Sequence, residues 1–401
     1  MMKKFYFFAA CAAAVLVVGC AKNEVYQTPP QEQPVSFSVY THSTPDTKTV
    51  GGELGSQTNN TLGDASKSGF GVFCFYSNNS TNGTSNDYTA SPTSNFVPNF
   101  MWNQQVKGNG NGSSAATAWT YSPVKYWPNE YNASVTAQGI DKLTFFAYAP
   151  WVDAVKTTGV VTGADEGITR ISSNDTAVPA DPTLTYVVPA SIANHVDVLY
   201  ADATSLKNLT KPASNAAVAF PFKHALTSVV FRVQTFIDGT NNTGNLEDLG
   251  GDITSGTTVT LKEVHFGGAT VYPSGTLNIA TGAWNPVSAT SKTFDKTGLT
   301  HNVTKAKADV AGMTPIMLIP NASAATYNIR VVYDVITADD KLAAESITVT
   351  NDIKNTMNLT LQAGKKNIID LVLGLYSVKM TATVTDWEAA TAVEVDLPAN
   401  N

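Results

Sequence analysis

The chain has 401 residues, a formal net charge of −7 and a low share of charged residues, 14%. No basic stripe runs along it, which argues against nucleic acid as a partner, because phosphate binding needs clustered positive charge. The length predicts two or three domains. Low charge together with abundant threonine and valine favours an extracellular β protein.

The N-terminus carries the parts of a secretory signal. Two lysines precede an apolar run over residues 5–18, which is too short to span a bilayer as a helix of about 20 residues. The run ends in Val17-Val-Gly-Cys20, which resembles the lipobox of bacterial lipoproteins. We therefore expect residues 1–19 to be removed and Cys20 to carry lipid, with the outer membrane as destination. The alternative is an ordinary signal peptide that is cut at another small residue.

A tether, a strand and a loop are predicted next. Residues 20–34 are polar and contain three prolines, which is typical of a flexible linker. Residues 35–40 alternate apolar and polar side chains, the period of a half-buried strand. The polar residues 41–68 predict an exposed loop, and Lys48 lies within it.

Short apolar or alternating segments recur from residue 70 to residue 384, with turn residues between them and no helical period. This pattern indicates β-sandwiches. The polar stretch 207–215 is the expected boundary, so we predict domains at 35–210 and 211–388. The predicted strands are 70–76, 100–103, 119–121, 142–151, 184–188, 196–200, 217–224, 226–236, 257–266, 275–279, 315–319, 327–336, 359–361, 368–375 and 377–384.

The last residues, 389–401, form a tail beyond the second predicted domain. In this tail Val393, Val395 and Leu397 alternate with acidic residues. An alternating apolar pattern is competent to form a strand with one buried face.

No constellation of catalytic or metal-binding residues is visible. The histidines are not spaced as metal pairs, and no nucleophile motif or phosphate-binding loop occurs. We therefore predict no enzymatic activity, no metal and no cofactor. Weaker alternatives are a calcium site at Asp339-Asp340 and sugar stacking by Trp127, Trp151 or Trp387. The histidines are His42, His195, His224, His265 and His301.

Cysteine usage predicts a fold without disulfides. Once Cys11 leaves with the signal and Cys20 carries lipid, Cys74 is the remaining thiol and cannot form an internal bridge. Cys74 lies in the apolar run 70–76 and is predicted to be a buried strand residue. His224 is likewise predicted to be a packed or capping residue.

Three groups of residues, in order behind the lipobox, carry a resemblance to a known family. The first is Tyr126-Trp-Pro with Leu143-Thr-Phe-Phe-Ala-Tyr, and the second is Asp197-Val-Leu-Tyr-Ala with Phe222-Lys-His-Ala-Leu. The third joins Ala363-Gly-Lys through Leu371-Val-Leu-Gly-Leu to Val384-Thr-Asp-Trp. The sequence resembles the fimbrillin family, the subunits of the type V pili of anaerobic gut and oral bacteria.

This resemblance implies two transthyretin-like β-sandwich domains and a mode of assembly. Family subunits cross the outer membrane as lipoproteins, and an arginine- or lysine-specific protease then cuts the loop after the first strand. In this chain the removable segment would be residues 35–48, with the cut at Lys48. The family's cut is most familiar after arginine, whereas no arginine precedes Arg170 here, so the protease and the position of the cut depart from the family pattern.

The resemblance further implies that the emptied groove accepts a strand from another subunit. The donor would be the tail, through Val393, Val395 and Leu397; the alternative is that the tail forms the last strand of its own domain. The expected partners are other copies of the chain, related fimbrial subunits, the processing protease and, through the lipid on Cys20, the outer membrane.

The predicted function is that of a stalk subunit of an adhesive cell-surface fimbria, located at the outer membrane and, after processing, in the fimbrium. A tip or anchor subunit stays open. The alternative from another class is a monomeric outer-membrane lipoprotein that keeps its lipid and binds glycans or other ligands.

Overall fold

The computed structural model describes residues 32–41, 62, 65–77, 87–88, 99–110, 118–128, 141–153, 166–171, 181–212, 214–235, 257–338 and 346–387. Within these ranges the chain forms strands and two short 3₁₀ turns, η2 (Ile192–Asn194) and η3 (Ala203–Ser205), and no α-helix. The predicted all-β fold is therefore confirmed. No helix in the described part of the chain has the length and hydrophobicity that crossing a bilayer requires.

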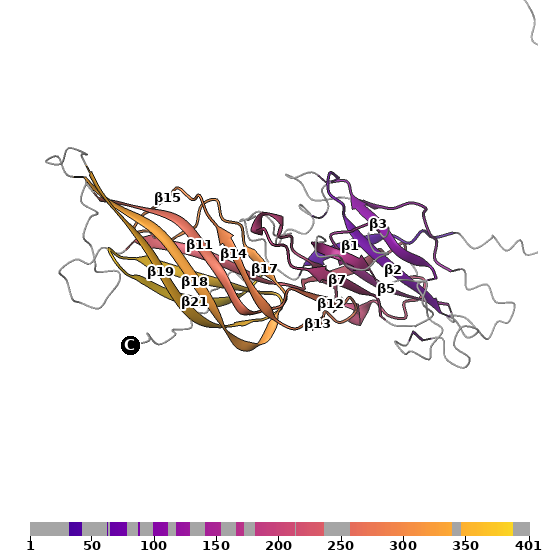
Figure 1. Ribbon diagram of the computed structural model, residues 1–401. Coiled ribbons are helices and arrows are strands. Elements are labelled where there is room, and N and C mark those ends of the chain that lie inside the picture. Colours follow the sequence, from indigo (N-terminus) through magenta and orange to yellow (C-terminus); the bar gives the residue numbers. More distant parts are fainter. Residues whose placement is uncertain are drawn as a thin grey trace, which may run out of the picture.

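Seven strands form the first sheet, in the order β1-β9-β8-β5-β2-β3-β4. Most of this sheet lies in the purple lobe of Figure 1. In its central strand β2 every residue except Tyr76 is buried, since both faces of the sheet are covered. The strands are β1 (Phe37–Thr41), β2 (Phe70–Ser77), β3 (Met101–Gly108), β4 (Trp119–Thr120), β5 (Lys142–Ala149), β8 (Leu199–Ala201) and β9 (Val218–His224).

A four-stranded sheet, in the order β13-β12-β7-β6, covers one face of the first sheet. Phe73 and Phe146 of the first sheet share a core with Leu184, Tyr186 and Leu277 of the second. The strands are β6 (Gly167–Ile171), β7 (Thr183–Val187), β12 (Ser274–Asn278) and β13 (Trp284–Pro286).

The second lobe, orange and yellow in Figure 1, is a sandwich of two further sheets, ordered β14-β11-β18-β19 and β16-β10-β20-β21. Phe231 of one sheet meets Phe266 of the other edge to face, with ring centroids 6.1 Å apart. The strands are β10 (Thr227–Thr235), β11 (Thr257–Val271), β14 (Thr290–Lys296), β15 (His301–Val303), β16 (Ala308–Asp309), β17 (Ile316–Leu318), β18 (Asn321–Ala338), β19 (Ser346–Leu361), β20 (Lys365–Leu373) and β21 (Val378–Asp386).

Strand pairing crosses residue 210, where the sequence predicted a domain boundary. β9 follows that residue, yet it is hydrogen-bonded to β1 and β8 in the first sheet. β12 also follows it and pairs with β7. The position of a strand in the sequence therefore does not determine which sheet it joins.

Every predicted strand between residues 70 and 384 overlaps an observed one, although the bounds differ. The strands without a predicted counterpart are short or polar, and β14 buries only Phe294. One inward apolar side chain does not produce the alternation on which a strand prediction depends. The strands that the sequence did not predict are β6, β13, β14, β15, β16 and most of β19.

Candidate functional site

β1 is the edge strand of the first sheet, and it is the first strand of the described chain. It pairs in parallel with β9, from Phe37 opposite Val218 to Thr41 opposite Phe222. Within the described sheet β9 is its partner, so removing β1 would expose one whole edge of β9. An exposed edge presents unpaired N–H and C=O groups, which accept another strand.

The residues before β1 close the sheet against its opposite end. The amide of Val35 donates to the carbonyl of Lys125, and the amide of Trp127 donates to the carbonyl of Gln33, both at 2.9 Å. Tyr121, next to β4, donates its hydroxyl to the carbonyl of Val35 at 2.7 Å. The segment 33–41 therefore bridges β9 at one end of the sheet and the residues after β4 at the other.

Three side chains of this segment point into the core at every second position. Val35, Phe37 and Val39 are only 2%, 5% and 6% exposed. Alternate residues of a strand face the same side of a sheet, so a single strand fills three successive subsites. The core that receives them is made of apolar side chains. This site can hold an apolar strand.

The middle subsite is aromatic on several sides. The Phe37 ring lies with its centroid 5.2 Å from Tyr121, 5.4 Å from Phe220, 6.1 Å from Phe145 and 6.4 Å from Phe70. These rings come from the segment after β4 and from β9, β5 and β2, so tertiary structure assembles the subsite from four separate parts of the chain. Aromatic pairs at such distances add about 0.5–1.5 kcal/mol each beyond the burial of area.

Burial of the three inward side chains supplies much of the binding energy of this strand. Each apolar side chain of this size contributes roughly 1.5–3 kcal/mol when it is fully buried, so the three contribute roughly 4.5–9 kcal/mol together. The backbone hydrogen bonds to β9 add to this value. The groove beneath β1 is thus a strand-binding site in which affinity comes from main chain and apolar pockets together.

The residues predicted for lipidation, cleavage and strand donation lie outside the described residues. They are Cys20, Lys48, Val393, Val395 and Leu397. The described chain ends at Trp387, and its ring stacks on the ring of His224 at 4.2 Å with an interplanar angle of 2°. Since His224 ends β9, Trp387 lies beside the end of the strand that pairs with β1.

The buried polar residues have structural roles. His224 is 4% exposed and its Nδ1 lies 2.5 Å from Asp197, which agrees with the predicted packed histidine. Met317 donates its amide to Nδ1 of His195, so the proton of that ring is on Nε2 and is donated to the Pro189 carbonyl. Burial lowers the pKa of His195 from 6.5 to about 4, and the imidazole is neutral at physiological pH.

The thiol and the tryptophans singled out in the sequence are covered. Cys74 is fully buried, as predicted, and burial raises the pKa of its thiol, which keeps it unreactive. Trp127 and Trp387 are 3% and 5% exposed, so neither ring presents a face to a sugar. Trp151 is half-buried and donates its indole N–H to the carbonyl of Asn103 at 3.1 Å.

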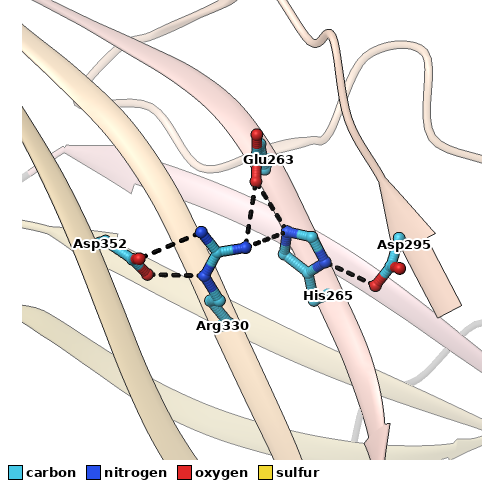
Figure 2. A network of polar contacts seen from close by, with 5 residues as sticks. All are labelled: Glu263, His265, Asp295, Arg330 and Asp352. Carbon is cyan, nitrogen blue, oxygen red and sulfur yellow. Dashed lines mark hydrogen bonds and ion pairs between the residues drawn. The ribbon is translucent and has the colours of Figure 1, made fainter. Parts of the chain in front are cut away.

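Figure 2 shows a second polar cluster, on the outer face of the second lobe. Arg330 donates both to Asp352, at 2.7 and 3.0 Å, and to Glu263, at 3.2 Å. It also lies 2.9 Å from His265 Nε2, and the same ring nitrogen lies 2.9 Å from a carboxylate oxygen of Glu263. The other ring nitrogen, Nδ1, donates to Asp295 at 2.5 Å.

This network ties β14, β11, β18 and β19 together across the sheet. Within the network, the hydrogen bond that Arg330 donates to Asp352 lowers the pKa of the Asp352 carboxyl. No group of three or more His, Cys, Asp or Glu side chains in the described ranges has an arrangement that could hold a metal ion. The network is a surface ion-pair ladder, which stabilises strand register.

Sequence reasoning identified the first strand and, through the family resemblance, expected a groove beneath it, but it did not identify the residues that line the groove. Tyr121 and the carbonyl of Lys125 close that groove, and no local pattern assigns them this role. The available signal in the sequence was the aromatic density of residues 119–127.

Comparison with known proteins agrees with this architecture. A family model described as fimbrillin-like matches residues 58–387. The structure of a fimbrial protein from Bacteroides vulgatus is 19% identical, with a TM-score of 0.62, over 88% of this chain and 99% of that one. At this level of identity the likeness shows a shared fold.

Two further structures align with lower TM-scores. A candidate cell adhesion protein from Bacteroides uniformis is 17% identical, with a TM-score of 0.42, over 89% of this chain and 99% of that one. A fimbrial assembly protein from Parabacteroides distasonis is 10% identical, with a TM-score of 0.35, over 91% and 100%. A search of functionally characterised proteins gives no significant match. The family model spans most of the sequence, and this chain therefore belongs to the fimbrillin-like family.

Proposed function

We propose that this protein is a stalk subunit of a cell-surface fimbria that polymerises by strand exchange. Membership of the fimbrillin-like family supports a role as a fimbrial subunit at the cell surface. In the proposed cycle, lipid on Cys20 delivers the chain to the outer membrane. Cleavage at Lys48 then frees the first strand, and the tail of another subunit replaces it.

The observation that carries the proposal is the way β1 is held. It is an edge strand with three buried apolar side chains, and it pairs with the rest of the sheet through β9. The polar loop that contains Lys48 follows it directly in the sequence. A single cut in that loop would make the strand a separate peptide, which can dissociate without unfolding the remaining sheet.

The tail has the pattern of a replacement strand. Val393, Val395 and Leu397 repeat the spacing of Val35, Phe37 and Val39, with one polar residue between each pair. An incoming strand of this kind gains affinity from main-chain pairing and specificity from its alternate side chains. Because the donor and the groove are different parts of the subunit, each contact would be head-to-tail, and such contacts continue into a filament when they do not close into a ring.

The test uses the lipid-free chain from residue 20, cut with a lysine-specific protease. We expect cleavage at Lys48, followed by a ladder of multimers on a denaturing gel run without boiling. Lys67 is exposed and lies in the same predicted loop, so the control replaces both lysines. A Lys48→Ala, Lys67→Ala variant keeps its first strand and should stay monomeric under the same treatment. Wild-type protein that is cut at Lys48 and remains monomeric would show that strand exchange does not occur.

A second pair of variants tests the donor. Val393→Asp with Val395→Asp should abolish the ladder, because a carboxylate in an apolar subsite is costly to desolvate. Glu394→Asn with Asp396→Asn alters the intervening positions, which would face away from the groove, and should leave the ladder intact. Normal polymerisation of the Val393/Val395 variant would exclude the tail as donor.

A further inference from the structure

The three subsites beneath β1 differ in what they hold. Val35 and Val39 fill the outer two, whereas the middle one takes the whole ring of Phe37. That ring is 5% exposed and has four aromatic neighbours, with centroid distances from 5.2 to 6.4 Å. The middle subsite is therefore shaped for an aromatic side chain.

The tail of this chain does not supply one. Its alternating residues are Val393, Val395 and Leu397, and all three are aliphatic. When three inward residues fill three subsites, the middle residue meets the middle subsite whether the strand runs parallel or antiparallel to β9. Val395 would therefore replace Phe37 in either direction, with an isopropyl group where a phenyl ring was held.

We infer that the middle subsite determines which donor the groove accepts, and that its preferred partner is a chain whose tail carries an aromatic side chain where this chain has Val395. The inference rests on the strand exchange proposed above. An undersized side chain leaves a void whose lining loses its contacts, and three of the four surrounding rings are fixed in β2, β5 and β9 and cannot collapse into it.

Two consequences follow for assembly. The first strand is a better ligand for the groove than the tail is, so an intact subunit does not exchange strands until its first strand is cut away. After the cut, a related subunit with an aromatic donor outcompetes a second copy of this chain. The groove thus favours contact with a different fimbrial subunit, so that the two kinds of subunit would alternate along the fibre or meet where one kind is attached to the other.

Peptide binding to the cut chain tests this selectivity. The full chain carries Val393→Asp and Val395→Asp, which silence its own tail, and the cleaved first strand is washed out in mild denaturant. Four labelled peptides are titrated by fluorescence anisotropy: residues 33–41, residues 389–401, the tail peptide with Val395→Phe, and the tail peptide with Val393→Phe as the matched control.

The first-strand peptide and the Val395→Phe peptide should each bind at least about tenfold more tightly than the wild-type tail, which equals about 1.4 kcal/mol. The Val393→Phe peptide should show no such gain, because its ring meets an outer subsite that holds valine. Equal affinities of the wild-type and Val395→Phe peptides, or an equal gain from Val393→Phe, would overturn the inference and leave strand exchange standing. If the first-strand peptide itself fails to bind, the proposed strand exchange is wrong as well.

Discussion

Replacing Phe37 by alanine should destabilise the first sheet by about 3–5 kcal/mol, the usual cost of removing a buried phenylalanine ring. The ring is almost fully buried and lies against four other rings. Loss of its burial accounts for roughly 1.5–3 kcal/mol. The contacts with the four neighbouring rings supply the remainder, because aromatic pairs contribute beyond the burial of area. Three of the four neighbouring rings, those of Phe70, Phe145 and Phe220, belong to hydrogen-bonded strands, so they cannot move in to fill the space.

Urea unfolding of the lipid-free chain, followed by tryptophan fluorescence and circular dichroism, measures this loss. Trp119 and Trp127 both contact the core that holds Phe37 and report on its opening. Ser38→Ala, on the same strand but facing away from the core, is the control and should stay within about 0.5 kcal/mol of wild type. A change of less than about 1 kcal/mol for Phe37→Ala would refute the view that β1 is held mainly by its inward side chains.

Three other predictions concern the core. Burial lowers the pKa of His195 from 6.5 to about 4. The contribution of its neutral ring to the free energy of unfolding is therefore complete above pH 6.5, and about 3 kcal/mol is lost as the pH falls toward 4. His195→Asn should flatten this pH slope in urea titrations, and an unchanged slope would contradict the assignment. Asp370→Ala should cost about 1.5–3 kcal/mol, because Arg232 loses a bidentate partner at 2.7 and 2.9 Å and Lys307 loses a partner at 2.8 Å. Adding Arg232→Met should restore part of the loss in the same assay, and no recovery would show that Arg232 and Asp370 are not coupled. Gly267→Ala should lower the free energy of unfolding by about 1–3 kcal/mol, since its Cβ would lie 2.0 Å from a backbone oxygen of β14; wild-type stability would mean that β14 can shift.

The alternation of apolar and polar residues made much of the fold predictable. Segments such as 142–151 and 226–236 carry enough inward apolar residues to identify a strand, and both are strands in the structure. β14 and β16 have too few apolar residues to be recognised, because they are held mainly by neighbouring strands. The predicted lipidation of Cys20 depends on a short local motif, which can be recognised without a fold.

The strand-binding groove could be predicted only in part, because local alternation identifies a strand but not the residues that surround it. The sequence by itself identifies the first strand, with Val35, Phe37 and Val39 on one face, and it identifies the matching spacing in the tail. Only the tertiary structure places β1 in parallel beside β9, closes the groove through Tyr121 and surrounds Phe37 with rings from four separate segments. Local periodicity determines which face of a strand is apolar. The partner of that face is determined by long-range packing, which joins residues more than 180 positions apart in the chain.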